Sequence, residues 1–474
     1  MRPGPTFADV KSGSSAPKRL VYQPLVGGVA LLQSVMDRTK TAEPLPLTLR
    51  VYRALLTVGA PLAGLLLSHR LKRGKEDVTR LAERRGESKL ARPDGPLVWV
   101  HGSSVGEVAA IIPLVERLVA KEFNVLVTSG TVSSATLAGQ RLPPGVIHQF
   151  VPLDSPRFVG SFLNHWKPDL GLFTESDLWP NLILMSSARR IPLILVNGRV
   201  SERSYKRWRV FPGMIGALLS RFDLCLAQSP AYATRYRDLG APRIATTGNL
   251  KLDLPEPPAD SDSLQKLQEA IGDRPTIAAA STHAGEETAL IETHRRLRHT
   301  FPRLLTIIAP RHPERGPGIA EIAKDAGLYA TQRSRGLLPQ RQDDIYIVDT
   351  LGELGLVYRL APIVFVGGSL ASHGGQNPVE PIKLGAAVLH GPHVWNFSEI
   401  YAALDAERGA EQISDVGKLT VRVGALLTDA AERAAITSAA RATVARLGGA
   451  LDRTVTALDP YLMQIRMEQR DSHA

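Results

Sequence analysis

A carboxylate follows the first long apolar run of the chain. Glu107 closes HGSSVGE (residues 101–107), which comes directly after the apolar run 97–101 and opens a helical pattern. The dipole of a helix keeps a carboxylate in its first turn ionised, and an ionised carboxylate beside a ligand can act as a general base. A glutamate at this position can also simply stabilise the start of the helix. Spacing alone leaves both interpretations open.

A pair of carboxylates, Glu175 and Asp177, lies in FTESDLWPNL (residues 173–182), again after an apolar run. Such a pair can bind a metal ion or hold a sugar hydroxyl. Asp177 can instead cap the helix that Pro180 begins, because aspartate is favoured as a helix cap and proline in the first helical turn. Both roles stay open for Asp177.

Basic residues follow two further apolar runs. Arg199 opens the basic loop of VNGRVSERSYKRW (196–208), and Lys251 lies in GNLKLD (248–253). Because guanidinium groups bind phosphates well, the loop at Arg199 suits a phosphorylated acceptor, although a solvated basic loop has the same composition. Lys251 stands just before a proline-rich hinge, where a lysine can steady a leaving phosphate.

The second half of the chain carries loops rich in glycine and in hydrogen-bond donors. Arg311 follows an apolar run in APRHPER (309–315), and Asn377 and Glu380 lie at an expected helix start in GGSLASHGGQNPVEP (367–381). Glycines in such loops free backbone amides for phosphate, and a glutamate one turn into a helix can accept both hydroxyls of a ribose. Several such loops at the ends of consecutive strands indicate a nucleotide site.

These loops need a scaffold that brings strand ends together. Short apolar runs alternate with helical patterns on both sides of a hinge at 252–263, which is typical of parallel sheets covered on both faces. The predicted fold is therefore α/β, with two doubly wound domains. The expected strands are 97–101, 124–129, 146–151, 169–174, 192–197, 223–228, 276–281, 304–310, 344–349, 362–369 and 386–392, and helices close the chain from about residue 415 to 470.

The expected organisation has four parts. A disordered N-terminal extension (1–45) precedes a membrane-proximal basic helical segment (46–92). An N-terminal domain (93–254) and a C-terminal domain that includes the closing helices (255–474) follow. We expect removal of residues 1–76 to leave the two domains folded.

Charge sets the beginning of the chain apart. Almost all of the net charge of +11 lies before residue 93, whereas an enzyme of nucleic acids carries a positive field on its functional body. We therefore expect no nucleic-acid partner. Ala54–Leu67 is an uncharged run flanked by cations, shorter than the roughly 20 residues of a clean span. It predicts an interfacial or re-entrant helix on a membrane surface; a buried core helix is the alternative.

Other features bear on the compartment and on metal sites. The single cysteine, Cys225, forms no internal disulfide, which favours a reducing, cytoplasmic compartment. The sequence has no Walker A motif, its only Asp-x-Asp string (260–262) lies in the hinge, and its histidines lack metal-ligand spacing. We therefore expect no metal ion and no cofactor.

Taken together and in order, seven segments resemble those of the 3-deoxy-D-manno-octulosonic acid (Kdo) transferases of lipopolysaccharide assembly. The resemblance runs from about residue 47 to 440 and includes a membrane-proximal helix before the first strand. The segments are SSVGE (103–107), TESDLWPNL (174–182), VNGRVSERS (196–204), GNLKLD (248–253), APRHPER (309–315), DTLGE (349–353) and GGSLASHGGQNPVEP (367–381).

The resemblance implies a GT-B glycosyltransferase in which two Rossmann-like domains face a cleft. It implies inverting, metal-independent transfer of Kdo from CMP-Kdo to a lipid A precursor (lipid IVA) at the cytoplasmic face of the cell inner membrane. By motif, Glu107 is the catalytic base, while Asp177, which stands where the family commonly has glutamate, and Lys251 stabilise the transition state. The residues matching CMP-contacting segments are Pro310, Arg311, Leu351, Gly352, Glu353, Asn377, Pro378, Val379 and Glu380, and Arg199 belongs to the acceptor loop.

Two other functions stay open at this point. One is a UDP-sugar-dependent transferase of the same fold that acts on another lipid acceptor. The other is a non-catalytic module that binds membrane surfaces.

Overall fold

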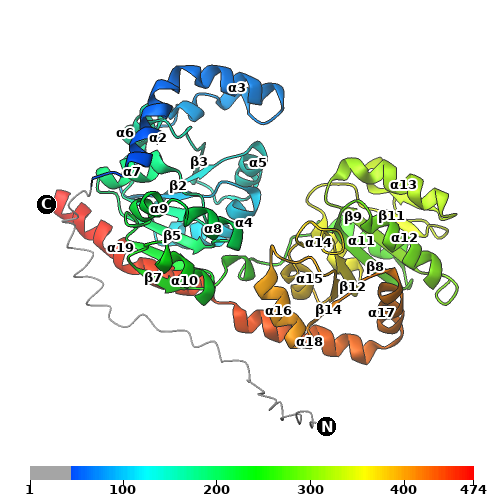
Figure 1. Cartoon of the computed structure of the whole chain (residues 1–474). Coiled ribbons are helices and arrows are strands. Elements are labelled where there is room, and N and C mark those ends of the chain that lie inside the picture. The colour runs from blue at the N-terminus through cyan, green and yellow to red at the C-terminus, as the bar shows by residue number, and fades with distance from the viewer. Residues whose placement is uncertain (1–43, 474) are drawn as a thin grey trace, which may run out of the picture. The chain divides into compact units, whose positions relative to one another are not determined.

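Two compact units make up the computed structural model, which describes residues 44–473 (Figure 1). The first contains the chain up to Val108, Leu114–Thr247 and the stretch from Thr454 onward, and the second contains Ala109–Pro113 and Gly248–Arg453. The predicted disordered extension (1–45) therefore lies almost entirely outside the described residues.

The first unit is built on a parallel sheet. Its strands are β1 (Leu97–His101), β2 (Asn124–Ser129), β3 (Ile147–Phe150), β4 (Leu170–Thr174), β5 (Leu193–Gly198), β6 (Leu224–Ala227) and β7 (Ile244–Thr246). They lie in the order β3-β2-β1-β4-β5-β6-β7. All five residues of the central strand β1 are buried, as expected for a strand that is covered on both faces.

The helices that alternate with these strands are α4 (Val105–Ala120), α5 (Val132–Arg141), α6 (Pro156–Trp166), α7 (Pro180–Ala188), α8 (Glu202–Trp208), α9 (Pro212–Leu219) and α10 (Pro230–Asp238). Serine or threonine caps several of them. Ser104 accepts a hydrogen bond from the third amide of α4, and Thr131 and Ser134 form a reciprocal capping box on α5. Such caps fix where each helix begins and so position the loop before it.

The second unit repeats this architecture. Its strands are β8 (Thr276–Thr282), β9 (Leu305–Pro310), β10 (Ala330–Gln332), β11 (Ile345–Ile347), β12 (Ile363–Val366), β13 (Ala387–His390) and β14 (Ala410–Gln412), in the parallel order β10-β11-β9-β8-β12-β13-β14. In β8, Ile277 and Ala279 belong to one buried apolar cluster, and Ala278 and Ala280 belong to another. Because neighbouring side chains of a strand point to opposite faces, both faces of this sheet are buried.

The α-helices of this unit are α11 (Ser261–Ile271), α12 (Glu286–Leu297), α13 (Gly316–Asp325), α14 (Leu354–Leu360), α15 (Val379–Lys383), α16 (Ser398–Ala406), α17 (Val416–Thr428) and α18 (Ala430–Leu447). Short 3₁₀ helices lie at Leu250–Leu252, Pro313–Arg315 and Arg333–Arg335. The eleven predicted strands are all present, and β7, β10 and β14 were not predicted.

In each sheet the strand order changes direction at one point. In the first unit the chain runs outward from β1 through β2 to β3, and then continues with β4 on the other side of β1; in the second unit, β8 and β12 meet in the same way. In open parallel sheets, ligands bind beyond the carboxyl ends of the strands at such a point. The loops after β1, β4, β8 and β12 are therefore the places where a site is expected.

The predicted membrane-proximal segment forms two helices on the first unit (Figure 1). They are α2 (Leu47–Val58) and α3 (Ala63–Lys72), joined by a 3₁₀ turn and bent by 51°. Within the described residues no single helix is long and apolar enough to cross a membrane, although this bent pair passes a test of length and composition together. Most of its apolar side chains are exposed, for example Leu55 (66%) and Leu65 (72%), so the alternative of a buried core helix is wrong.

Part of this segment is nevertheless anchored in the core. Leu49 is fully buried in the apolar cluster of the first unit, and the hydroxyl of Tyr52 donates to Asp154. Glu76 forms a buried ion pair with Arg84. Removing one partner of a buried ion pair costs about 3–5 kcal/mol. Deletion of residues 1–76 would remove all three anchors, which argues against the expectation that the remainder stays fully folded.

The last helix, α19 (Ala450–His473), begins in the second unit and belongs to the first from Thr454 onward. Arg466 donates to the carbonyl of Lys121, whose ammonium group pairs with Asp459. The predicted boundary assigned all of the closing helices to the second domain. The spacing of buried residues predicts a helix here but carries no information on which unit the helix covers.

Gly86 gives a direct test of how the segment before β1 is docked. Its φ is 76°, and a Cβ there would lie 2.0 Å from the carbonyl oxygen of Phe158 on α6. We expect Gly86→Ala to lower the free energy of unfolding of the first unit by at least about 2 kcal/mol. Gly139 lies inside α5 with open space around it, so Gly139→Ala is the control and should raise stability by about 0.5–1 kcal/mol. Equal effects in urea unfolding would contradict this packing.

Candidate active site

Two predicted site residues of the first unit meet at the point where its sheet reverses direction. Glu107 lies in the first turn of α4, which follows β1, and Asp177 lies in the loop after β4. Strands β1 and β4 are paired neighbours, with His101 opposite Phe173. The topology therefore brings together two carboxylates that are far apart in sequence.

The carboxylate of Glu107 is held by neighbours on three sides. The Ser103 amide donates to its Oε2 at 2.8 Å, the Ser104 hydroxyl donates to its Oε1 at 3.1 Å, and Thr174 Oγ1 lies 3.2 Å from Oε2. Ser104 in turn accepts from the Glu107 amide and caps the helix. The position at a helix start, one of the two roles left open, is thus confirmed; it also fixes the carboxylate in a single orientation at the strand ends.

Burial, more than the position at the helix start, determines the direction in which the pKa of Glu107 is shifted. Burial raises the pKa of Glu107, and the nearby carboxylates of Glu175 and Asp177 raise it further, against the lowering effect of the Ser103 amide. The pKa of Glu107 thus lies above its ordinary value, whereas the helix dipole alone would lower it. A carboxylate with a raised pKa is a stronger base when ionised, which suits the abstraction of a proton near neutral pH.

Asp177 is positioned by a buried histidine. Its Oδ2 lies 3.1 Å from Nε2 of His101, and Nδ1 of the same ring lies 2.9 Å from Thr128 Oγ1. Burial alone would raise the pKa of Asp177, but hydrogen bonds from His101, Ser103 and Trp179 hold it below its ordinary value. Since an ionised carboxylate only accepts, the proton of a neutral His101 lies on Nε2.

The alternative role of Asp177 as a helix cap is wrong. The residue before α7 is Trp179, which makes no side-chain cap. The first amides of α7 instead donate to Asp154, at 3.0 Å from Asn181 and 2.9 Å from Leu182. Burial raises the pKa of Asp154 to about 6. Asp177 is therefore left available for a ligand.

Backbone strain marks the same edge of the sheet. Glu175 and Asn197, at or just after the ends of β4 and β5, both have a φ of 53°. Left-handed backbone at residues other than glycine is costly and concentrates at functional sites. The hydroxyl of Tyr236 donates to the carbonyl of Glu175 at 2.8 Å and supports this conformation.

Arg199 follows β5 directly, in the half-buried loop before α8. The other basic residues of this stretch, Arg203, Lys206 and Arg207, lie exposed on α8, and Lys206 pairs with Glu202. The structure therefore assigns Arg199 to the sheet edge that carries Asp177, and most of the remaining charges to a solvent-facing helix.

In the second unit, predicted site residues again follow the strands. Arg311, a predicted residue, follows β9. His283, which was not predicted, follows β8 and lies beneath the glycine-rich loop that follows β12. His283 stacks on His373 with ring centroids 4.0 Å apart and lies 5.9 Å from His312. Burial and the neighbouring imidazoles lower the pKa of His283, so this ring is neutral at pH 7.

The glycine-rich loop does not offer its amides in the way that the sequence predicted. Glu286, which is buried, accepts hydrogen bonds from the amides of Gly368, Ser369, Leu370 and Ala371 at 2.8–3.1 Å. Its carboxylate thus occupies the position expected for a phosphate in this part of the loop. The finding corrects the expectation that glycine there frees the amides for a ligand.

The two remaining predicted segments lie at loop and helix starts. Leu351 is exposed, Gly352 has a φ of 84°, and Glu353 accepts from Arg333 at 2.8 Å. Burial alone would raise the pKa of Glu353, but the hydrogen bonds from Arg333 and Thr350 lower it.

Asn377, Pro378, Val379 and Glu380 form the start of α15, as predicted. The side-chain oxygen of Asn377 accepts from the Val379 amide at 3.1 Å, and its side-chain amide donates to Glu380 at 3.3 Å. Pro310 ends β9. All of the predicted nucleotide-binding residues therefore belong to the second unit.

Lys251 lies in a 3₁₀ turn of the second unit, in a different unit from Glu107 and Asp177. Asp260, which begins the Asp-x-Asp string, caps α11 by accepting from Ser263. Among residues 44–473 no three His, Cys, Asp or Glu side chains lie close enough to hold a metal ion.

Sequence reasoning missed His101, Asp154 and Tyr52 as supporting residues. His101 closes the predicted strand 97–101 and stands two positions before SSVGE, so a polar residue at the end of a buried strand was the available signal. Asp154 and Tyr52 carry no such signal, because their roles depend on contacts with residues distant in sequence.

Comparisons with known proteins agree on one family. Residues 79–254 match the family model described as "3-Deoxy-D-manno-octulosonic-acid transferase (kdotransferase)". The chain is 37% identical over 393 residues to a probable mitochondrial 3-deoxy-D-manno-octulosonic acid transferase of Arabidopsis thaliana, covering 80% of this chain and 88% of that protein. It is 35% identical over 394 residues to the 3-deoxy-D-manno-octulosonic acid transferase of Haemophilus influenzae, covering 81% and 91%.

A solved structure supports the fold. A glycosyltransferase from Rickettsia africae superposes with a TM-score of 0.55 over 78% of this chain and 99% of its own length, at 12% identity. At that identity the likeness shows the fold alone. Together with the two seven-stranded parallel sheets, it confirms the predicted GT-B class of two Rossmann-like domains.

The interaction among the three carboxylates can be measured without a substrate. Glu175 raises the pKa of Glu107 by charge repulsion, so Glu175→Gln, which keeps the shape and removes the charge, should lower the pKa of Glu107. Carbon-13 NMR of labelled glutamate side chains, with Glu107→Gln to assign the signal, measures this shift. An unchanged or higher pKa of Glu107 in Glu175→Gln would contradict the electrostatic account.

Proposed function

Since the chain belongs to the 3-deoxy-D-manno-octulosonic acid (Kdo) transferase family and is a glycosyltransferase, we propose that it moves Kdo from CMP-Kdo to a hydroxyl of a lipid A precursor, lipid IVA. The observation that carries the proposal is the half-buried carboxylate of Glu107, which is fixed by Ser103 and Ser104 and whose pKa is raised by its surroundings.

The proposed reaction is a direct displacement. Ionised Glu107 takes the proton of the acceptor hydroxyl while the hydroxyl oxygen attacks the anomeric carbon of Kdo. The bond from that carbon to the phosphate oxygen of CMP breaks, and CMP leaves with the electron pair. Attack on the face opposite the leaving group inverts the anomeric configuration. The raised pKa of Glu107 helps, because an ordinary carboxylate is a weak base for an alcohol.

The other catalytic residues act on charge. Lys251 offsets the charge that develops on the leaving phosphate, and fixed cations can serve in place of a metal ion for this purpose. Asp177, ionised and oriented by His101, stabilises the positive charge that develops on the sugar ring. We therefore propose that catalysis needs neither a metal ion nor a cofactor.

The donor is proposed to bind in the second unit. Arg311 and Pro310, the segment Leu351–Glu353 and the segment Asn377–Glu380 hold CMP. Glu380, which lies in the first turn of α15, is proposed to accept the ribose hydroxyls. Arg199 is proposed to bind the phosphorylated acceptor in the first unit.

The place of action is proposed to be the cytoplasmic face of the cell inner membrane. The exposed apolar side chains of α2 and α3 and the cations that end α3 support this, because apolar groups and cations together favour the surface of an anionic bilayer. A UDP-sugar donor and a non-catalytic role, which the sequence left open, gain no support from family membership.

Replacing the proposed base is the first test. We expect Glu107→Gln to lower turnover of CMP-Kdo with lipid IVA by roughly 10²–10⁴-fold while CMP still binds. Glu116→Gln, an exposed residue of the same helix, is the matched control and should keep full activity. Products are identified by mass spectrometry with EDTA present. Undiminished Kdo transfer by Glu107→Gln would contradict the role of the base, and product from UDP-sugars alone would contradict the donor.

The membrane contact is tested separately. The side chains of Leu55, Leu62 and Leu65 are exposed, so replacing all three with Gln should leave thermal stability nearly unchanged. Binding to anionic vesicles should fall at least about a hundredfold, because each buried leucine contributes about 1.5–3 kcal/mol. Val421→Gln, at an exposed apolar position of α17, is the control. Flotation of the triple variant with vesicles at the wild-type level would contradict the proposal.

A further inference from the structure

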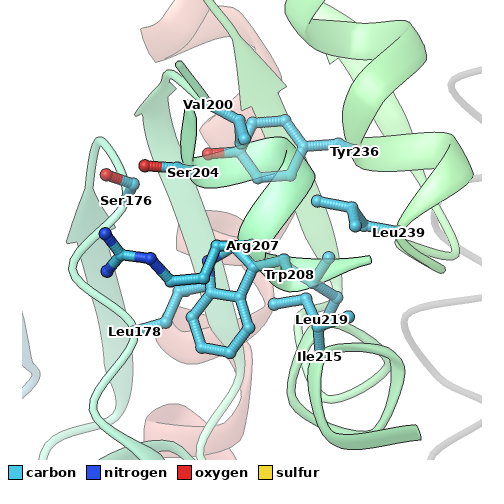
Figure 2. A pocket seen from close by; sticks show the side chains of 10 residues that line it. All are labelled: Ser176, Leu178, Val200, Ser204, Arg207, Trp208, Ile215, Leu219, Tyr236 and Leu239. Atoms are coloured by element: carbon cyan, nitrogen blue, oxygen red, sulfur yellow. The ribbon is translucent and has the colours of Figure 1, made fainter. Parts of the chain in front are cut away.

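The first unit contains a cavity that the proposed reaction does not use. Its volume is about 260 Å³, and it lies between the loop after β4, the loop after β5 and helices α8, α9 and α10. Figure 2 shows Ser176 and the guanidinium of Arg207 on one side, with Leu219, Ile215 and Leu239 on the other.

One wall of the cavity is apolar. Ile215, Leu219 and Leu239 are buried members of the apolar core, and the rings of Trp208 and Tyr236 complete the wall. The hydroxyl of Tyr236 is already used, because it donates to the carbonyl of Glu175. This wall suits a hydrocarbon chain, while the rest of the accessible lining is polar.

The polar groups of the cavity lie together on one side. They are the hydroxyls of Ser176 and Ser204 and the guanidinium of Arg207. In the described part of the chain, no hydrogen bond or ion pair is found for the exposed guanidinium of Arg207, whereas Arg235 nearby pairs with Glu202. An apolar wall beside an unpaired cation fits an amphiphile whose hydrocarbon chain lies close to an anionic group.

The cavity is adjacent to the candidate acceptor site. Ser176 and Leu178, which line it, are the chain neighbours of Asp177, and Val200 follows Arg199. If an acceptor presents a hydroxyl to Glu107 and a phosphate to Arg199, its other substituents therefore lie near the opening of the cavity.

The surface around the cavity continues to the membrane-proximal helices. Val210 and Phe211, which directly precede α9, are exposed apolar residues. A Cβ on Gly213, at the start of α9, would lie 3.9 Å from Pro46, the residue that precedes α2. The segment that borders the cavity thus adjoins the segment with the exposed apolar face.

We propose that this cavity binds an acyl chain of the lipid acceptor and that Arg207 pairs with an anionic group of the same molecule. The inference rests on the proposed function, since it assigns a place to the lipid part of that acceptor. It explains why a cavity with an apolar wall adjoins a site whose other side chains are charged.

Occupancy can be measured without any transfer reaction. Bromine quenches tryptophan fluorescence on contact, so a dibrominated fatty acid bound in the cavity of the full chain should quench Trp208. Trp208→Phe should remove most of this quenching, and Trp179→Phe, which replaces an exposed tryptophan outside the cavity lining, should retain it. Absence of quenching in the native chain, or its survival in Trp208→Phe, would overturn the proposal.

A second experiment links the cavity to the acceptor. Ser204→Phe narrows the opening, and Thr234→Phe places the same ring at an exposed position of α10 outside the cavity. With lipid IVA we expect Ser204→Phe to raise KM at least about fivefold, because losing even one buried methylene weakens binding roughly fourfold. With the acyl-free phosphorylated disaccharide, Ser204→Phe should match the wild type, and Thr234→Phe should match it with both acceptors.

The outcomes separate the two proposals. If Ser204→Phe changes KM equally for both acceptors, or for neither, the acyl site is overturned. If KM changes equally for both acceptors and brominated phospholipid vesicles also quench Trp208, the cavity binds bulk lipid instead. If the wild type transfers Kdo to neither acceptor, the proposed function fails, and the fluorescence experiment still decides whether the cavity takes a hydrocarbon chain.

Discussion

The partial burial of one carboxylate, Glu107, beside two others is the constraint on which the rest of the site depends. Glu107 stands between β1 and β4, where the sheet of the first unit reverses direction, and Glu175 and Asp177 raise its pKa by charge repulsion. These three carboxylates stay close together despite their repulsion only if the surrounding residues hold them in a rigid arrangement. The Ser103 amide, the Ser104 hydroxyl and the left-handed backbone of Glu175 provide that arrangement. The pKa values of Asp177 and Glu107 also shift in opposite directions, because hydrogen bonds from His101 and its neighbours lower that of Asp177 while burial and charge repulsion raise that of Glu107.

The same arrangement connects the site to the membrane-proximal helices. Asp154 accepts from the first amides of α7, directly after the Asp177 loop, and also from the hydroxyl of Tyr52 on α2. Burial raises the pKa of Asp154 to about 6, so this link carries a full negative charge only above that pH. A helix with an exposed apolar face is thus linked through Asp154 to the start of α7, and Pro46, just before that helix, adjoins α9, which borders the cavity. The segment proposed to bind the lipid surface is therefore connected to the residues proposed to bind the lipid acceptor.

Much of this architecture is predictable from sequence, and the failures have physical causes. Most of the eleven predicted strands are continuous apolar runs, since their positions inside the sheets bury both faces; β3, a half-buried edge strand, is the exception. The missed strands β7, β10 and β14 are three-residue strands at sheet edges, which need no such run. The helix starts that carry Glu107 and Glu380 were predicted from local patterns. Three features were not predicted: the raised pKa of Glu107, the occupation of the glycine-rich loop by Glu286 and the attachment of α19 to the first unit. Each depends on residues that only the fold brings together.

The central claim is that a half-buried carboxylate with a raised pKa, that of Glu107, accepts the proton of the acceptor hydroxyl. The pH dependence of kcat/KM for Kdo transfer by the wild-type enzyme, measured with CMP-Kdo and lipid IVA, tests it most directly. Because the base must be ionised in the free enzyme, the account predicts a loss of activity on the acid side through a single ionisation with a pKa above the ordinary value of 4.5. An acid limb at or below that value, or a rate independent of pH there, would contradict it.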